Sequence, residues 1–143
     1  MIDVKMISKA GIKPFYATED SAGIDLPAHI DVAIDIPPFN RRLIPTGLHV
    51  AIPKGHVGLV CPRSGLAIKK GLTVLNAPGV IDGDFRGEIG VILINLSNEV
   101  QSINPGDRIA QLVITKYEKA NFQLTNSLDE TERGSGGFGS TGA

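Results

Sequence analysis

The sequence predicts an all-β protein, a jelly roll or distorted β-barrel of short strands with one short helix. Apolar-rich stretches of three to eight residues follow one another at short intervals, and Gly or Pro ends most of them. With 17 Gly and 9 Pro, the backbone has many places at which it can reverse direction. Stretches with the 3.6-residue period of a helix are few. Short strands at this spacing are typical of sandwiches, barrels and jelly rolls.

The size and charge of the chain limit the classes of function. Its 143 residues suit one domain with a substantial core, which we expect at residues 1–131, followed by a Gly/Ser-rich segment at residues 132–143. The net charge is −1 and the pI is about 6.3, so no basic excess favours binding to long nucleic acids. Any anionic ligand is expected to be small and held locally.

Cysteine content and hydropathy predict a cytoplasmic protein. Cys61 is the only cysteine, so an intrachain disulfide is impossible and a reducing compartment is expected. The longest run without Asp, Glu, Lys or Arg is eleven residues, which is too short to cross a bilayer. The N-terminal region carries Asp3, Lys5 and Lys9 instead of an apolar signal core. We expect a protein that binds neither membranes nor nucleic acids.

Eight strands are expected in chain order. They lie at residues 4–7, 32–36, 42–44, 48–52, 57–61, 73–75, 89–96 and 108–115. The strand at 89–96 is almost entirely apolar, which predicts burial on both faces. Asp25 lies between two apolar residues, so it is either exposed on the polar face of a strand or bound into a site. Gln111, inside the last strand, is either a satisfied core amide or a ligand-binding group.

The one predicted helix spans Ser64–Lys70. Ser64 is suited to cap the first N–H groups, Lys69 and Lys70 suit the negative end of the helix dipole, and Gly71 suits a left-handed stop. Arg63 and Ser64 stand at the positive end, where an anion such as phosphate is stabilised. The alternative is a purely structural cap with a solvated arginine.

Residues 79–90 (GVIDGDFRGEIG) combine turn chemistry with reactive groups. Asp82 and Gly83 between apolar segments predict a hairpin, since Gly83 accepts a positive φ at no steric cost. This hairpin would hold Asp82 over a pocket, and the alternative is a turn with no further role. A calcium loop is excluded because Arg86 and Leu93 occupy positions that need oxygen ligands.

Residues 132–143 (ERGSGGFGSTGA) are either a flexible tail or a lid. Backbone N–H groups of successive Gly and Ser residues can wrap a polyphosphate. Phe138 would then need an apolar partner, and a nucleobase qualifies. The glycine spacing matches a dinucleotide fingerprint, but no βαβ unit surrounds it, so that site is excluded. The histidines lack the spacing of a zinc site and are assigned no role: His29, His49 and His56.

Five segments, taken in order, resemble the five motifs of the trimeric dUTPases. They are residues 22–26 (AGIDL), 62–67 (PRSGLA), 79–90, 106–112 (GDRIAQL) and 133–142 (RGSGGFGSTG). The resemblance implies a jelly-roll homotrimer that hydrolyses dUTP to dUMP and pyrophosphate with Mg²⁺, limiting uracil in DNA and supplying dUMP for thymidylate synthesis. It also implies active sites shared between subunits, with residues 132–143 closing over the site of a neighbouring subunit.

The same resemblance implies a role for individual residues. Asp82 matches the family's catalytic aspartate, which orients and deprotonates a water for attack on the α-phosphorus and contacts the deoxyribose 3′-OH. The implied contacts to uracil and deoxyribose are Asn76, Gly79, Ile81, Asp82, Phe85, Gly87 and Phe138. The implied phosphate contacts are Arg63, Ser64, Gly65, Gln111, Arg133, Ser140 and Thr141. Mg²⁺ would be held mainly through the triphosphate and waters, with Asp25 and Gln111 as outer-shell residues.

Substrate selection also follows from the resemblance. Backbone groups along residues 79–87 would bind the Watson–Crick edge of uracil in a fit too close for the 5-methyl group of thymine. The ring of Phe85 would lie beneath the sugar, where a 2′-OH would collide or lose its solvation. Many family members have Tyr at this position, so Phe85 keeps the ring and lacks the hydroxyl.

Two alternatives belong to other functional classes. The dCTP deaminases share this fold, but their general-base glutamate falls in a segment that resembles residues 94–98, where this chain has Asn95. An amide cannot accept the proton, which disfavours deamination. A non-catalytic nucleotide-binding jelly roll would have no need for both Asp82 and a lid that carries Phe138.

Overall fold

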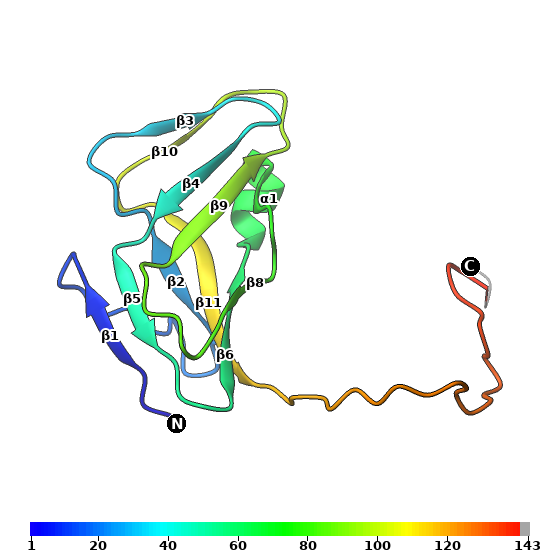
Figure 1. Cartoon of the computed structure of the whole chain (residues 1–143). Coiled ribbons are helices and arrows are strands. Elements are labelled where there is room, and N and C mark those ends of the chain that lie inside the picture. The colour runs from blue at the N-terminus through cyan, green and yellow to red at the C-terminus, as the bar shows by residue number, and fades with distance from the viewer. Residues whose placement is uncertain (141–143) are drawn as a thin grey trace.

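The computed structural model describes residues 1–140, which form a jelly roll of open antiparallel sheets (Figure 1). Two sheets have two strands each: β1 (Lys5–Ser8) with β5 (Leu48–Ala51), and β3 (Ile34–Ile36) with β10 (Gln101–Ile103). A third sheet has the order β2 (Gly23–Pro27), β11 (Arg108–Lys116), β6 (His56–Cys61) and β8 (Gly79–Ile81). A fourth has the order β4 (Arg41–Pro45), β9 (Gly90–Asn95) and β7 (Leu72–Val74). The all-β prediction is confirmed, but the sheets within residues 1–140 do not close into a barrel.

The eight predicted strands all occur, each within two residues of its expected bounds. The sequence did not predict β10, because its three residues, Gln101–Ile103, include only one large apolar side chain. Pairing with β3 explains why it is extended: Ile103 lies opposite Ile34, and Gln101 opposite Ile36. Strand pairing therefore defines this element where local sequence does not.

The core is formed by one face of each of the two larger sheets. This corrects the expectation that the strand at residues 89–96 is buried on both faces. In β9, Val91 and Leu93 are fully buried, but Ile92 and Ile94 on the other face are only half-buried within the single chain. The buried face packs with Leu26 of β2, Ile44 of β4 and other buried side chains of the same core. The strand is therefore buried on one face in this chain, not on two.

Helix α1 (Ser64–Lys70) has the predicted bounds and the predicted left-handed stop, since Gly71 has a φ of 63°. The predicted cap at Ser64 is wrong. Ser64 is already the first helical residue, and Arg63 occupies the N-cap position without a side-chain cap hydrogen bond. No helix among residues 1–140 is long and apolar enough to span a membrane.

The predicted hairpin at residues 79–90 is also wrong. β8 pairs with β6, whereas β9 pairs with β4 and β7, so residues 82–89 cross from one sheet to another. Gly83 does not adopt a positive φ. An Asp-Gly hairpin requires its two flanking segments to pair with each other, and here each flanking segment has a different partner. We call residues 82–89 the crossing loop.

Beyond β11 the chain leaves the sheets as an extended segment (Figure 1). Its apolar side chains are solvent-exposed, with Phe122 at 93% and Leu124 at 106% of full exposure. We call residues 117–140 the tail. The structure therefore separates the tail from the jelly roll that precedes it.

Candidate active site

A carboxylate and two guanidinium groups form the centre of one polar cavity. Asp25 of β2 accepts from Arg63 Nε at 2.9 Å and from Arg108 Nη1 at 3.2 Å. Arg63 also donates from Nη1 to the Arg108 carbonyl oxygen at 3.1 Å. Of the two alternatives for Asp25, the structure favours the residue bound into a site. The three side chains carry a formal charge of about +1 together, which leaves capacity for an anion.

Gln111 faces the same cavity from β11. It lies opposite Asp25 on β2 and Cys61 on β6, and its Nε2 donates to the Pro62 carbonyl oxygen at 3.0 Å. A methyl group at Gly23 would come within 2.9 Å of Gln111 Oε1, so the amide packs directly over this glycine. Gln111 is half-buried with its amide nitrogen bonded.

The cavity has a volume of about 560 Å³ and brings together five of the predicted residues. They are Asp25, Arg63, Ser64, Gly65 and Gln111. Sequence reasoning missed Arg108, whose guanidinium group completes the contact with Asp25. We call this the arginine cavity.

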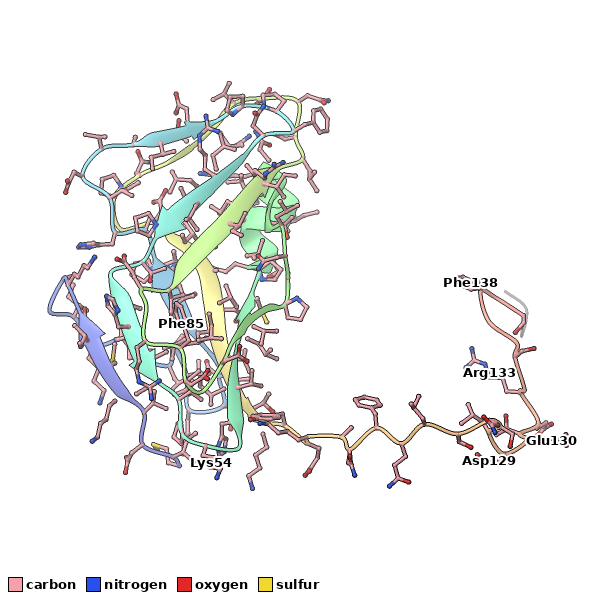
Figure 2. All side chains as sticks on the ribbon, viewed as in Figure 1. Lys54, Phe85, Asp129, Glu130, Arg133 and Phe138 are labelled. Carbon is pink, nitrogen blue, oxygen red and sulfur yellow. The ribbon has the colours of Figure 1, made fainter. Side chains whose placement is uncertain are left out.

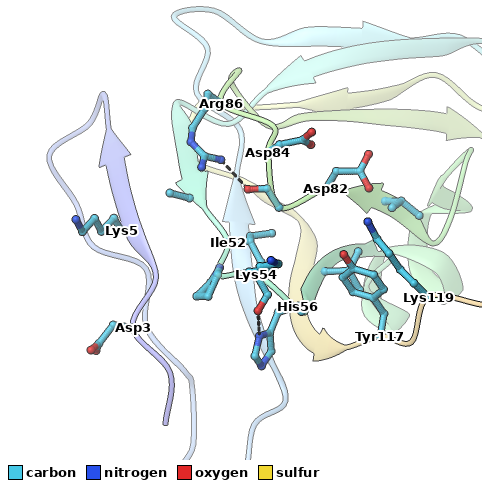
Figure 3. A pocket seen from close by; sticks show the side chains of 16 residues that line it. Asp3, Lys5, Ile52, Lys54, His56, Asp82, Asp84, Arg86, Tyr117 and Lys119 are labelled. Carbon is cyan, nitrogen blue, oxygen red and sulfur yellow. Dashed lines mark hydrogen bonds between the residues drawn. The ribbon is translucent and has the colours of Figure 1, made fainter.

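Asp82 lies elsewhere, at the rim of a second cavity of about 980 Å³ (Figure 3). Its surroundings are charged, and side chains that the sequence did not indicate share the cavity with it: Lys54, His56, Tyr117 and Lys119. They come from separate parts of the chain, since Lys54 lies between β5 and β6, His56 begins β6, and Tyr117 and Lys119 follow β11, so local sequence does not show that they meet. The single chain therefore does not place Asp82 in the arginine cavity.

The predicted nucleoside residues form two close pairs near Asp82. A methyl group at Gly87 would come within 2.6 Å of Phe85 Cζ, so the ring of Phe85 packs directly on Gly87. A methyl group at Gly79 would come within 3.3 Å of Asn76 Nδ2. Ile81 extends the same segment as the last residue of β8, opposite Gly58.

Arg133 and Phe138 of the tail lie far from the jelly roll and from both of its cavities (Figure 2). Phe138 is fully exposed, and Arg133 donates from Nε to the Gly136 carbonyl oxygen at 2.9 Å. Ser140 is exposed and packs near Gly136. Thr141 lies outside the described residues. One chain therefore presents the predicted site as three separate parts.

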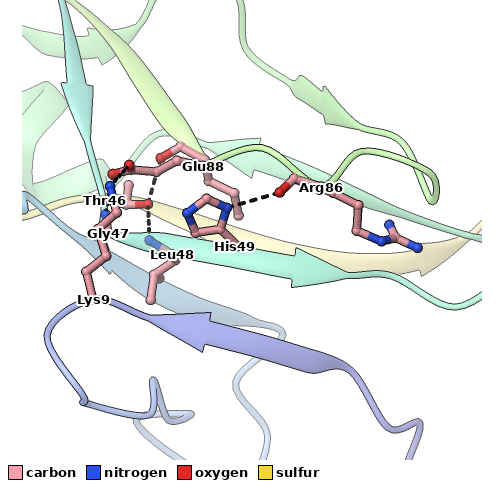
Figure 4. Close-up of polar contacts among 8 residues, drawn as sticks. Lys9, Thr46, Gly47, Leu48, His49, Arg86 and Glu88 are labelled. Carbon is pink, nitrogen blue, oxygen red and sulfur yellow. Dashed lines mark hydrogen bonds and ion pairs between the residues drawn. The ribbon is translucent and has the colours of Figure 1, made fainter.

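A polar network holds the far end of the crossing loop (Figure 4). Glu88 Oε1 accepts from the Gly47 N–H at 2.8 Å, and Glu88 Oε2 pairs with Lys9 Nζ. Contact with Lys9, together with the Gly47 N–H, holds the pKa of Glu88 below its ordinary value of 4.5, so this carboxyl is ionised at neutral pH. His49 Nδ1 lies 3.0 Å from the Arg86 carbonyl oxygen, so His49 contacts the crossing loop.

The jelly roll with its arginine cavity, lined by the guanidinium groups of Arg63 and Arg108, belongs to the class of proteins that bind a small anionic ligand. The sequence model of the family described as dUTPase matches residues 10–142. The chain therefore belongs to the dUTPase family.

Individual relatives agree with this assignment. The deoxyuridine 5′-triphosphate nucleotidohydrolase of Fusobacterium nucleatum is 51% identical over 142 residues, which cover 99% of this chain and 97% of the relative. The protein of the same name from Rickettsia felis is 53% identical over 138 residues, which cover 96% and 93%. Among solved structures, a Staphylococcus bacteriophage 80alpha dUTPase G164S mutant with dUpNHpp superposes with a TM-score of 0.84 at 28% identity, covering 99% of this chain and 98% of that one. The predicted family resemblance is confirmed.

Proposed function

We propose that this chain is a dUTP diphosphatase, which hydrolyses dUTP to dUMP and pyrophosphate. The observation that carries the proposal is identity at about half of all positions, over nearly the whole chain, with proteins named deoxyuridine 5′-triphosphate nucleotidohydrolase. The geometry supports it, because Asp82 supplies a carboxylate for a water molecule and the arginine cavity supplies cations for phosphates. The dCTP deaminase alternative is not favoured.

In the proposed mechanism, Asp82 orients a water molecule and accepts its proton. The water oxygen forms a bond to the α-phosphorus, and the bond from that phosphorus to the oxygen that bridges to the β-phosphate breaks. Pyrophosphate leaves with the bridging oxygen. Most of the rate gain in such a transfer comes from positioning and charge neutralisation, which we assign to Arg63, Ser64, Gly65 and Gln111, and to Arg133, Ser140 and Thr141 of the tail.

Mg²⁺, when bound, would neutralise charge on the triphosphate. Both carboxylate oxygens of Asp25 face guanidinium groups, at 2.9 and 3.2 Å. Among residues 1–140, no group of three His, Cys, Asp or Glu side chains is placed to hold a metal ion. Because the Asp25 oxygens already face guanidinium groups, we propose that triphosphate oxygens and waters are the direct ligands of the cation. Asp25 and Gln111 would then lie outside its first ligands.

We propose a homotrimer in which each active site draws on more than one subunit. The placement of Asp82 and of the arginine residues in two separate cavities of one chain supports it. The tail supports it too, because Phe122, Leu124 and Phe138 are at least 93% exposed and suit docking on another subunit. Residues 132–143 would then form the lid. We place the enzyme in the cytoplasm, where the thiol of Cys61 stays reduced.

A product assay tests the proposed function. Purified protein with Mg²⁺ is incubated separately with dUTP, dCTP, dTTP and UTP, and the nucleotide and phosphate products are identified. We expect dUMP and pyrophosphate from dUTP alone. Release of dUTP or dUMP from dCTP would favour deamination, and inertness toward all four would favour a binding module.

Replacing Gly87 by Ala tests the place of Phe85 beneath the sugar. The new methyl group would come within 2.6 Å of the ring, too close for any contact, and the ring, which is 40% exposed, would be displaced from its present position. We expect the preference for dUTP over UTP, measured as a ratio of kcat/KM, to fall about tenfold.

Gly83→Ala is the matched control in the same loop. Its methyl group would meet three backbone carbonyl oxygens at 3.5–4.0 Å, all ordinary contacts, and the nearest is that of Ile52. Equal losses of preference in both variants would show that the ring of Phe85 does not select the sugar.

A further inference from the structure

The crossing loop is anchored at its C-terminal end on residues 46–49. Thr46 Oγ1 donates to the Ile89 carbonyl oxygen at 2.7 Å, and the Ile89 N–H donates to the Leu48 carbonyl oxygen at 2.8 Å. Both contacts are made by the backbone of Ile89, the residue that follows Glu88. The loop therefore leaves β8 at Ile81, and its hydrogen bonds to residues 46–49 are made near its C-terminal end, by residues 86, 88 and 89.

Glu88 uses each carboxylate oxygen for a different partner (Figure 4). Oε1 accepts from the Gly47 N–H, and Oε2 pairs with Lys9, whose own N–H donates to the Gly47 carbonyl oxygen at 2.8 Å. The Glu88 side chain is 23% exposed, against 51% for Lys9. Glu88, Gly47 and Lys9 thus form a closed set of contacts between the loop, the connection from β4 to β5 and the segment after β1.

The other part of the loop, residues 82–86, is held together by hydrogen bonds among its own residues. Arg86 Nη1 donates to the carbonyl oxygens of Gly83 and Phe85, each at 2.8 Å, and the Phe85 N–H donates to the Asp82 carbonyl oxygen at 3.2 Å. Residues 82–86 therefore form one closed turn. Gly87 alone joins this turn to Glu88, and glycine restricts the backbone least of all residues. The turn also contacts β5 directly, since His49 Nδ1 lies 3.0 Å from the Arg86 carbonyl oxygen, and its orientation depends on this contact together with the anchor at Glu88.

We propose that Glu88, held by Lys9 and the Gly47 N–H, is a positioning residue for Asp82 and Phe85. The proposal rests on the proposed function of Asp82. Gly79 does not depend on this anchor, since it lies in β8, which pairs with β6, and the Asn76 amide packs beside Gly79. Loss of the ion pair therefore moves the catalytic carboxylate more than the segment that binds uracil.

Glu88→Gln and Lys9→Met test this inference. Glutamine keeps an oxygen for the Gly47 N–H but loses the ion pair, so folding is preserved. We expect kcat for dUTP to fall roughly tenfold in each variant, because small displacements of a catalytic group have large effects. KM should change less than about threefold, and the double variant should be no slower than either single variant, since both remove one interaction.

Lys13→Met is the matched control, because Lys13 is an exposed lysine of the same N-terminal segment with no ion pair among residues 1–140. It should keep the full kcat. A kcat unchanged in Glu88→Gln, or single-variant losses that multiply in the double variant, would overturn the inference.

Hydrogen exchange separates failure of this inference from failure of the proposed function. In Glu88→Gln, amides of residues 82–87 should exchange faster, while those of β9 keep their protection. Unchanged exchange in the loop would overturn the positioning role whatever the activity. A wild-type protein inert toward dUTP would overturn the proposed function and the catalytic part of this inference with it.

Discussion

Asp82→Asn is expected to lower kcat for dUTP hydrolysis by roughly 10²–10⁴-fold while nucleotide binding survives. Asparagine has the size of aspartate and keeps an oxygen for the sugar hydroxyl, but its amide cannot accept a proton from water. Turnover is measured by dUMP release, and binding of dUpNHpp by calorimetry. Loss of binding in this variant would make Asp82 a structural residue.

Asp84→Asn provides the control for that experiment. Asp84 is an exposed acid of the same closed turn and lines the same cavity as Asp82. Its removal changes the local charge by the same amount. We expect nearly full activity, and an equal loss in both variants would indicate an electrostatic effect of the loop instead of proton transfer by Asp82.

Truncation after Thr131 should have the second largest effect. It removes Arg133 and Phe138, and with them a charge for the phosphates and a ring for the base. We expect kcat to fall by about 10²-fold or more, as for loss of groups that position and enclose a substrate.

The truncated protein should keep its assembly and its melting temperature, because residues 132–140 make no contact with the sheets in the described structure. Size-exclusion chromatography and thermal unfolding check both properties. Full activity after truncation would contradict the lid.

The sequence predicted correctly those elements whose bounds depend on a few neighbouring residues. The helix at Ser64–Lys70 ends at Gly71 as expected, because a left-handed stop depends on one residue. The Asp-Gly hairpin failed because pairing partners are not local: β8 and β9 each found a strand distant in the chain. Register and partner choice depend on the whole sheet, which periodicity alone does not reveal.

The site residues likewise divide into those that the sequence predicted and those that it missed. Family resemblance implied Arg63 and Gln111 as phosphate contacts and Asp25 as an outer-shell residue for Mg²⁺, and the structure brings all three into one cavity. Arg108 and Glu88 were not expected, because their partners lie 83 and 79 residues away in the sequence. Nothing in the local pattern around Lys9 indicates that it contacts the loop of Asp82.

The contacts of Asp25 have a consequence for the energetics of substrate binding. Long arginine side chains lose about 1.5–2 kcal/mol of rotamer entropy when they become ordered. Here Asp25 orders Arg63 and Arg108 in the free protein, so this loss belongs to folding and not to nucleotide binding. The triphosphate would meet guanidinium groups already arranged to receive it, and preorganisation of this kind raises affinity without any additional contact.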